Sequence, residues 1–246
     1  ISSNTQGEIT LKKNDVSLVG SATDINTAVS GNLSAKYNGN ITINDNKDVT
    51  IEASTIISIG QKTVKIPTLS NEVKIKGNSD LVSNALDLIT NLGDANILLD
   101  DAHTLPELKN INNKTAGTIS FKNDTVELDG TTADIKAALD GITGYKGKIT
   151  LSDATTDTIK ATDITALADK TNQPTTIKTK FKIEGASADI VTALGKVVNT
   201  ANANIKFENN HTLSDLKTIN NATTGAIEFK NDKLALEGIT ADITAA

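Results

Sequence analysis

Residues 130–153 read GTTADIKAALDGITGYKGKITLSD, and the order of patterns within this stretch decides the fold. Its first half places Ile135, Ala138 and Leu139 at the i, i+3 and i+4 spacing of one apolar helix face. Its second half, residues 148–152, alternates apolar and polar side chains as a half-buried strand does. The stretch therefore predicts a short helix followed by a short strand.

Further helical patterns accompany this one. Thr131 and Asp134 form a plausible capping pair at the start of the first helix. A second helical pattern follows the strand in two versions, one at residues 159–167 and the other at residues 104–111 and 212–219. The latter version opens with Thr-x-x-Glu or Thr-x-x-Asp, which is the signature of a capping box.

Further alternating segments predict strands at residues 40–43, 118–121 and 204–207. The tripeptide at residues 122–124 then leads into another alternating run at residues 126–128. This tripeptide is either a hairpin turn or a bulge within one longer strand.

The whole chain is an internal repeat. Residues 1–20, 111–130 and 219–238 align without gaps, and the glycines that close them are 110 and 108 positions apart. Beyond Tyr37, whose equivalent is Tyr145, the offset is a steady 108 residues. A half-period is also present, because a Gly-x-x-(x)-Asp-aliphatic motif recurs at spacings of 57, 53, 55 and 53 residues. The marker glycines are Gly20, Gly77, Gly130, Gly185 and Gly238.

Two related modules of about 54 residues therefore alternate along the array. Neither end carries a polar capping unit, so we expect the native chain to extend in both directions. The predicted divisions are the end of a preceding repeat (1–19), an odd-type module (20–76), an even-type module (77–129), a second odd-type module (130–184), a second even-type module (185–237) and the start of a further repeat (238–246).

Short strands joined by short helices predict an α/β fold, namely a repeat solenoid of parallel strands backed by helices, as in leucine-rich repeats. The helices are too short to be stable alone, so their stability has to come from stacking on neighbours. The alternative is a beads-on-a-string chain of small α+β domains, one per module.

The composition excludes several classes of function. The chain has no Cys, Met or Trp, only 2% aromatic residues, and 24 basic residues that are all Lys. Without Cys there are no disulfides, thiol nucleophiles or thiolate metal sites, and without Arg there is no bidentate fork for phosphate. The net charge of −6 argues against nucleic acid as a partner. No apolar run is long enough to predict a transmembrane segment.

The two histidines do not predict catalysis. His103 and His211 occupy equivalent positions just before a capping Thr. A nucleophile and its base need a further orienting group, and repeat-equivalent positions do not create one unique site. We therefore interpret both as structural loop residues and predict no catalytic residue and no enzymatic activity.

Recurrent acidic residues are candidates for a metal site. They end strands at equivalent turns, where stacking could gather the six to eight oxygen ligands of Ca²⁺. Solvated turn residues are the alternative, because the chain has no calcium-binding nonapeptide or EF-hand loop. No other cofactor is predicted. The calcium candidates are Asp45, Asp48, Asp100, Asp101, Asp153 and Asp157.

The motifs of residues 111–121, 130–139 and 145–153 resemble degenerate repeats of very large bacterial cell-surface, adhesin-like and S-layer-like proteins, including cyanobacterial ones. The resemblance extends over nearly the whole chain. It implies an extracellular or cell-surface location and a non-catalytic role as a spacer, sheath, filament or self-assembling lattice. The implied partners are copies of the chain or neighbouring repeats. The alternatives are an adhesin module that binds a glycan or another cell, and a parallel-β enzyme, which the missing Arg disfavours.

Overall fold

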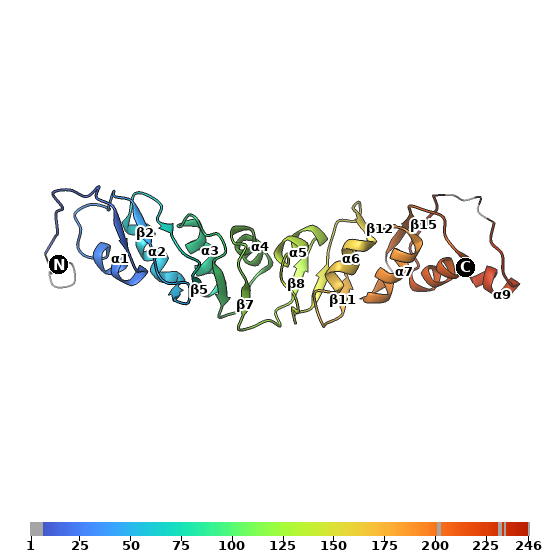
Figure 1. Cartoon of the computed structure of the whole chain (residues 1–246). Helices are drawn as coiled ribbons and strands as arrows, with labels where there is room; N and C mark the ends of the chain where they lie inside the picture. The colour runs from blue at the N-terminus through green and yellow to red at the C-terminus, as the bar shows by residue number, and fades with distance from the viewer. Residues whose placement is uncertain (1–6, 201–202, 231–232, 234, 246) are drawn as a thin grey trace. The chain divides into compact units, whose positions relative to one another are not determined.

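A computed structural model describes residues 7–200, 203–230, 233 and 235–245, which form an α/β fold (Figure 1). In these residues short strands alternate with helices, and the strands form four parallel sheets. The chain divides into two compact units, Ile1–Asn123 and Asp124–Ala246. Each unit is a series of repeat-like β–α elements.

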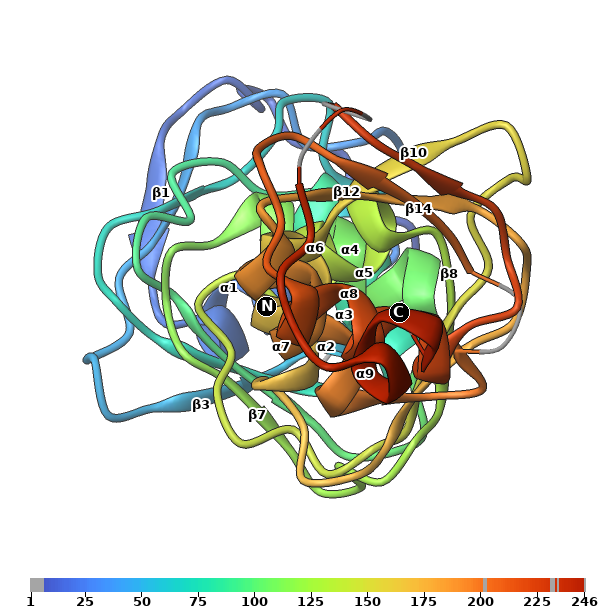
Figure 2. The same ribbon diagram turned by 90° about the vertical axis from the view of Figure 1, so that its right-hand side faces the viewer.

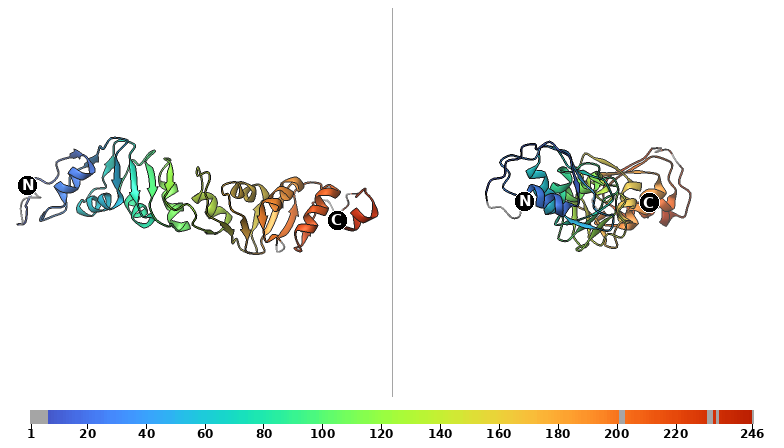
Figure 3. Two further views of the ribbon diagram at one scale, coloured as in Figure 1. Left: turned by 90° about the horizontal axis from the view of Figure 1, so that it is seen from below. Right: turned by 60° about the vertical axis from the view of Figure 1, so that its left-hand side comes forward.

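The first unit contains a three-stranded sheet, a four-stranded sheet and four helices among its described residues, coloured blue to green in Figure 3. Its helices pack in succession, α1 on α2, α2 on α3 and α3 on α4. The three-stranded sheet has the order β1 (Leu18–Gly20), β2 (Ile41–Ile43) and β4 (Thr68–Leu69). The four-stranded sheet has the order β3 (Thr50–Glu52), β5 (Lys74–Gly77), β6 (Asn96–Leu99) and β7 (Ile119–Phe121). The helices are α1 (Ala22–Val29), α2 (Ala53–Lys62), α3 (Ser79–Asp87) and α4 (Leu105–Lys114).

The second unit repeats this plan with two four-stranded sheets. Viewed as in Figure 2, β10, β12 and β14 run side by side, apart from helices α6, α7 and α8. One sheet has the order β13 (Val197–Val198), β11 (Thr175–Ile177), β9 (Ile149–Leu151) and β8 (Leu128–Gly130). The other has the order β10 (Thr158–Lys160), β12 (Lys182–Gly185), β14 (Asn204–Phe207) and β15 (Ile227–Glu228). The helices are α5 (Thr132–Ala138), α6 (Ala161–Ala168), α7 (Ser187–Lys196), α8 (Leu213–Ala222) and α9 (Thr240–Ala245).

Strand pairing defines the repeating element. Paired residues lie between 21 positions apart, as in Leu128 and Ile149, and 26 positions apart, as in Thr42 and Thr68. We call the stretch of chain from one strand to its neighbour in the same sheet a rung. Successive rungs bury aliphatic side chains of matching register between sheet and helices. Ile183 and Ile205, for example, are paired and 0% exposed.

The structure confirms the helix predicted after Gly130 as α5, with the Thr131 hydroxyl accepting from the backbone N–H of Asp134. It also confirms the capping box at the start of α4. The helix predicted for residues 159–167 starts later than expected, at Ala161. The residues before it, at 158–160, instead form β10, because their backbone pairs with β12 of the next rung.

Both predictions for residues 122–124 are wrong. β7 before them pairs with β6, whereas β8 after them pairs with β9 in a different sheet. The tripeptide is therefore neither a hairpin turn nor a bulge, and it lies where the first compact unit ends and the second begins. A local turn signal could not distinguish these cases, since the strands of the described residues pair in parallel with strands more than 20 positions away.

A hydroxyl and a glycine two positions apart hold a rung against the rung before it. The Tyr145 hydroxyl donates a 2.6 Å hydrogen bond to the carbonyl oxygen of Val126. Gly147 lies so close to the same oxygen that a Cβ there would be 1.8 Å from it. We call this pair the hydroxyl–glycine clasp. It recurs with Tyr37 and Gly39 on Val16, Thr115 and Gly117 on Ala95, and Thr223 and Gly225 on Ala203.

Substituting Gly147 with Ala should destabilise the second unit by about 2–4 kcal/mol, because a methyl group cannot fit against the Val126 carbonyl without moving the rung. Urea unfolding followed by circular dichroism measures the loss. Gly195→Ala is the matched control, since a Cβ there meets nothing within 4 Å and the glycine lies inside α7. Equal stabilities of the two variants would contradict the clasp.

Candidate functional site

Strand-end polar residues form the first set of candidate site residues, and they bond to the helix of the preceding rung. The first residue of α5, Thr132, donates its backbone N–H to Asp153, with N–O distances of 2.9 and 3.1 Å. The Thr132 hydroxyl also donates to Asp153, at 2.6 Å. Asp153 is only 2% exposed. Its carboxylate therefore satisfies backbone and side-chain donors at the positive end of a helix.

The same contact occurs at the start of three other helices. The backbone N–H of Ala22 in α1 donates to Asp45 at 2.7 Å, and that of Ser79 in α3 donates to Asp101 at 3.0 Å. In α7 the N–H of Ser187 donates to the side-chain oxygen of Asn209 at 3.0 Å. We call this contact the inter-rung cap. Asn209 is the repeat equivalent of Asp101, so the cap needs an oxygen acceptor but does not need a negative charge.

The remaining calcium candidates lie apart from these caps. Asp157 accepts a 2.9 Å hydrogen bond from the backbone N–H of Ala154 within its own turn. Asp100 lies 3.9 Å from the Lys76 ammonium group. Asp48 borders an open polar hollow of about 710 Å³ beside Glu72. No group of three or more His, Cys, Asp or Glu side chains suited to a metal ion occurs among the described residues. Calcium binding stays a prediction.

Both histidines are buried and pack against phenylalanine. His103 is 3% exposed, with its ring centroid 4.9 Å from that of Phe121. His211 is 8% exposed and lies 4.9 Å from Phe229. Burial lowers the pKa of His103, although Asp101 and Glu107 act in the opposite direction. Since the neutral form is favoured in the fold, acidification through the ordinary pKa of 6.5 removes stability from the first unit.

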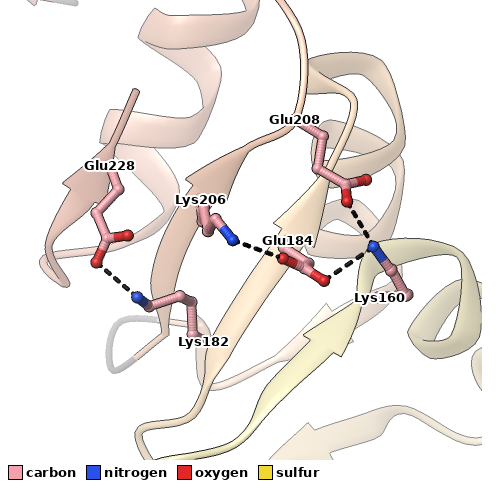
Figure 4. Close-up of polar contacts among 6 residues, drawn as sticks. All are labelled: Lys160, Lys182, Glu184, Lys206, Glu208 and Glu228. Carbon is pink, nitrogen blue, oxygen red and sulfur yellow. Dashed lines mark hydrogen bonds and ion pairs between the residues drawn. The ribbon is translucent and has the colours of Figure 1, made fainter. Parts of the chain in front are cut away.

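A second set of polar residues forms a row across the outer face of one sheet (Figure 4). Lys160 of β10 pairs in register with Glu184 of β12, Glu184 with Lys206 of β14, and Lys206 with Glu228 of β15. Lys160 and Lys206 form ion pairs with Glu184 at 2.8 and 3.1 Å. These two lysines, with Lys160 contributing most, lower the pKa of Glu184.

Two more residues complete this surface, which we call the charge row. Lys182 pairs with Glu228 at 2.6 Å, and Glu208 pairs with Lys160 at 2.5 Å. The sequence interpretation missed the charge row. A usable signal was present, because Ile is followed by Lys, Glu, Lys and Glu at residues 159, 183, 205 and 227, with spacings of 24, 22 and 22 residues.

One hollow, lined in part by Lys206, Glu208 and Glu228 of the charge row, combines aromatic and charged groups. Its volume is about 340 Å³. Phe229 is 41% exposed and stacks on Phe207, with ring centroids 5.6 Å apart. The first unit has Leu99 at the position equivalent to Phe207, so the two stacked phenylalanines belong to the second unit. The lining residues are Lys206, Phe207, Glu208, Glu228, Phe229 and Lys230.

Comparisons with known proteins add no relative. No family model matches the chain, and neither the curated proteins nor the solved structures give a match. In the portion of the chain that the structure describes, no helix has the length and apolar character needed to cross a membrane.

Substituting Asp153 with Ala should destabilise the second unit by about 2–3 kcal/mol, because the Thr132 N–H and hydroxyl lose their buried acceptor. Asp153→Asn should cost clearly less, as Asn209 caps α7 in the equivalent way. Equilibrium urea unfolding measures both. The exposed Asp48→Ala is the control, with an expected change within about 0.5 kcal/mol. Equal losses for Asp153→Ala and Asp48→Ala would disprove the cap.

Proposed function

We propose that the chain is a non-catalytic structural repeat element of a large extracellular surface protein, serving as a spacer, sheath or filament. The observation that carries the proposal is that the recurring motif residues form contacts between rungs. The inter-rung caps and the hydroxyl–glycine clasps bond one rung to the backbone of another, as at Asp153 and Tyr145. These residues set the spacing and stiffness of a stack of rungs. Because their polar groups are bonded to neighbouring rungs, they are not available to act on a substrate.

The finer form of the fold that we propose is a leucine-rich-repeat-like solenoid within each unit. Support comes from the sheet of β3, β5, β6 and β7, which joins strands on both sides of the module boundary at residues 76 and 77. Separate α+β beads, one per module, would confine each sheet to one module. In a solenoid each rung adds about 4.8 Å of length, so the number of rungs fixes the reach of the array.

In-frame deletion of residues 131–238 from the native gene tests this role. The deletion removes one 108-residue period and joins equivalent glycine frames, so the protein should still reach the cell surface and label with antibody on intact cells. The matched control deletes residues 131–225, which joins β8 directly to β15. That junction places a strand of a different sheet where the repeat frame requires a helix, so the product should fail to accumulate. Antibody labelling that requires permeabilised cells would overturn the proposal.

A second candidate function is glycan binding, which the hollow at Phe229 favours. An aromatic face carries negative electrostatic potential and attracts the C–H groups of a sugar ring. Carboxylates and ammonium groups on the rim, such as Glu208 and Lys230, can bond sugar hydroxyls. The volume of about 340 Å³ is at the lower end of the range of ligand sites.

Phe229→Ala should lower the affinity for any glycan that the chain retains on a glycan array by about tenfold or more, because the exposed ring supplies the stacking surface. Val64→Ala, at another exposed apolar residue, which lies in the first unit, should leave the affinity unchanged. Equal glycan binding by the two variants would show that the hollow is not the binding site.

A further inference from the structure

We propose that the charge row binds the charge row of a second copy of this chain, with the two rows antiparallel. In register across the strands the row reads Lys160, Glu184, Lys206, Glu228. The signs plus, minus, plus, minus become minus, plus, minus, plus when read backwards. A two-fold axis parallel to the strands and between the two faces therefore places Lys160 opposite the second copy's Glu228, and Glu184 opposite its Lys206.

The net charge favours this face for self-association. The chain carries a net charge of −6, so two copies repel each other on average. The charge row carries three lysines and three glutamates, which cancel (Figure 4). At this face two copies can approach without like-charge repulsion, and alternating signs fix their register.

The charged groups retain bonding capacity for a second copy. The side chains of Lys160 and Lys206 are 49% and 46% exposed, and those of Glu208 and Glu228 are 44% and 53% exposed. An ammonium group has three donors and a carboxylate accepts about four hydrogen bonds, so the one or two ion pairs that each group forms within the chain do not saturate it. Those pairs also hold the side chains in place, which reduces the entropy lost on association.

The sheet of the first unit provides an internal comparison. Its equivalent positions are Glu52, Lys76, Leu98 and Ser120, paired in register across β3, β5, β6 and β7. Only the first two are charged, so this row is not its own complement when reversed. The proposed contact is accordingly specific to the second unit. A row of four strands is a small interface, so the contact is weak for one pair of chains and gains strength through repetition along an array.

This inference deepens the proposed structural role, and rests on it, by naming lateral contact between copies as the way in which the arrays assemble. Sedimentation equilibrium of the full chain tests it. Wild-type association should weaken about tenfold or more between 0.01 M and 1 M NaCl, where the screening length falls from about 30 to about 3 Å. Lys76→Glu in the first unit should leave association unchanged.

Variants with reversed charges provide the decisive test of the contact. The double variant Lys160→Glu with Lys206→Glu makes the four in-register positions of the charge row all acidic, and Glu184→Lys with Glu228→Lys makes them all basic. Each should be monomeric alone, and an equimolar mixture should associate at least as tightly as the wild type. If circular dichroism shows that either variant does not fold, the double variant Lys160→Gln with Lys206→Gln is measured in its place. Its self-association should be about tenfold weaker than that of the wild type.

A mixture that associates no better than its components overturns the inference, as does wild-type association that the glutamine variant leaves unchanged. A wild-type chain that stays monomeric at 0.01 M NaCl while binding a glycan through Phe229 also overturns it. None of these outcomes bears on surface labelling of intact cells, so failure of this contact is distinguishable from failure of the proposed function.

Discussion

The fold depends on the hydrogen bond by which one rung satisfies the backbone of its neighbour. Each helix among the described residues is 6–10 residues long, too short to be stable alone, and its first N–H has no partner inside the helix. Asp153 supplies the partner for α5 from the next rung, while Tyr145 and Gly147 fix the distance to the rung before. Because the donors and acceptors belong to different rungs, no rung is complete without its neighbours. Stability in each unit is thus a property of the stack.

Sequence patterns predicted the elements that carry local signals. Capping residues such as Thr131 and Thr104 located α5 and α4, since the cap and the helix are neighbours in the chain. Strands such as Thr68–Leu69 have too few residues to show an alternation, and only pairing with another rung makes them strands. The predictions for residues 122–124 were wrong for the same reason. Local chemistry indicates where the chain turns, whereas the sheet to which a strand belongs is decided by residues more than 20 positions away.

The acidic residues show the same limit at the level of the site. Asp45 and Asp153 were identified as recurrent strand-end acids, but their helix N–H partners lie 23 and 21 residues earlier in the chain. Sequence distance hid those donors, so the sequence offered only a calcium site or solvated turns as explanations. Asn209 at the position of Asp101 was the informative exception, because an amide oxygen caps a helix but adds no charge to a calcium site. Substitution within a repeat therefore reports the role of a residue more directly than its recurrence does.

The repeats also differ in the side chains that they expose on the outer face of the sheet. Caps and clasps recur in both units at offsets of 108 or 110 residues, whereas the charge row and the stacked phenylalanines occur where the first unit has Leu98, Leu99 and Ser120. Buried contacts between rungs tolerate little change, since a misplaced acceptor leaves an unsatisfied group in both neighbours. Outward side chains carry no such constraint and can diverge from one period to the next. An array of this kind keeps one way of stacking while each period presents its own outer face, and this separation makes the outer sheet face of the second unit the place where contacts with other molecules are expected.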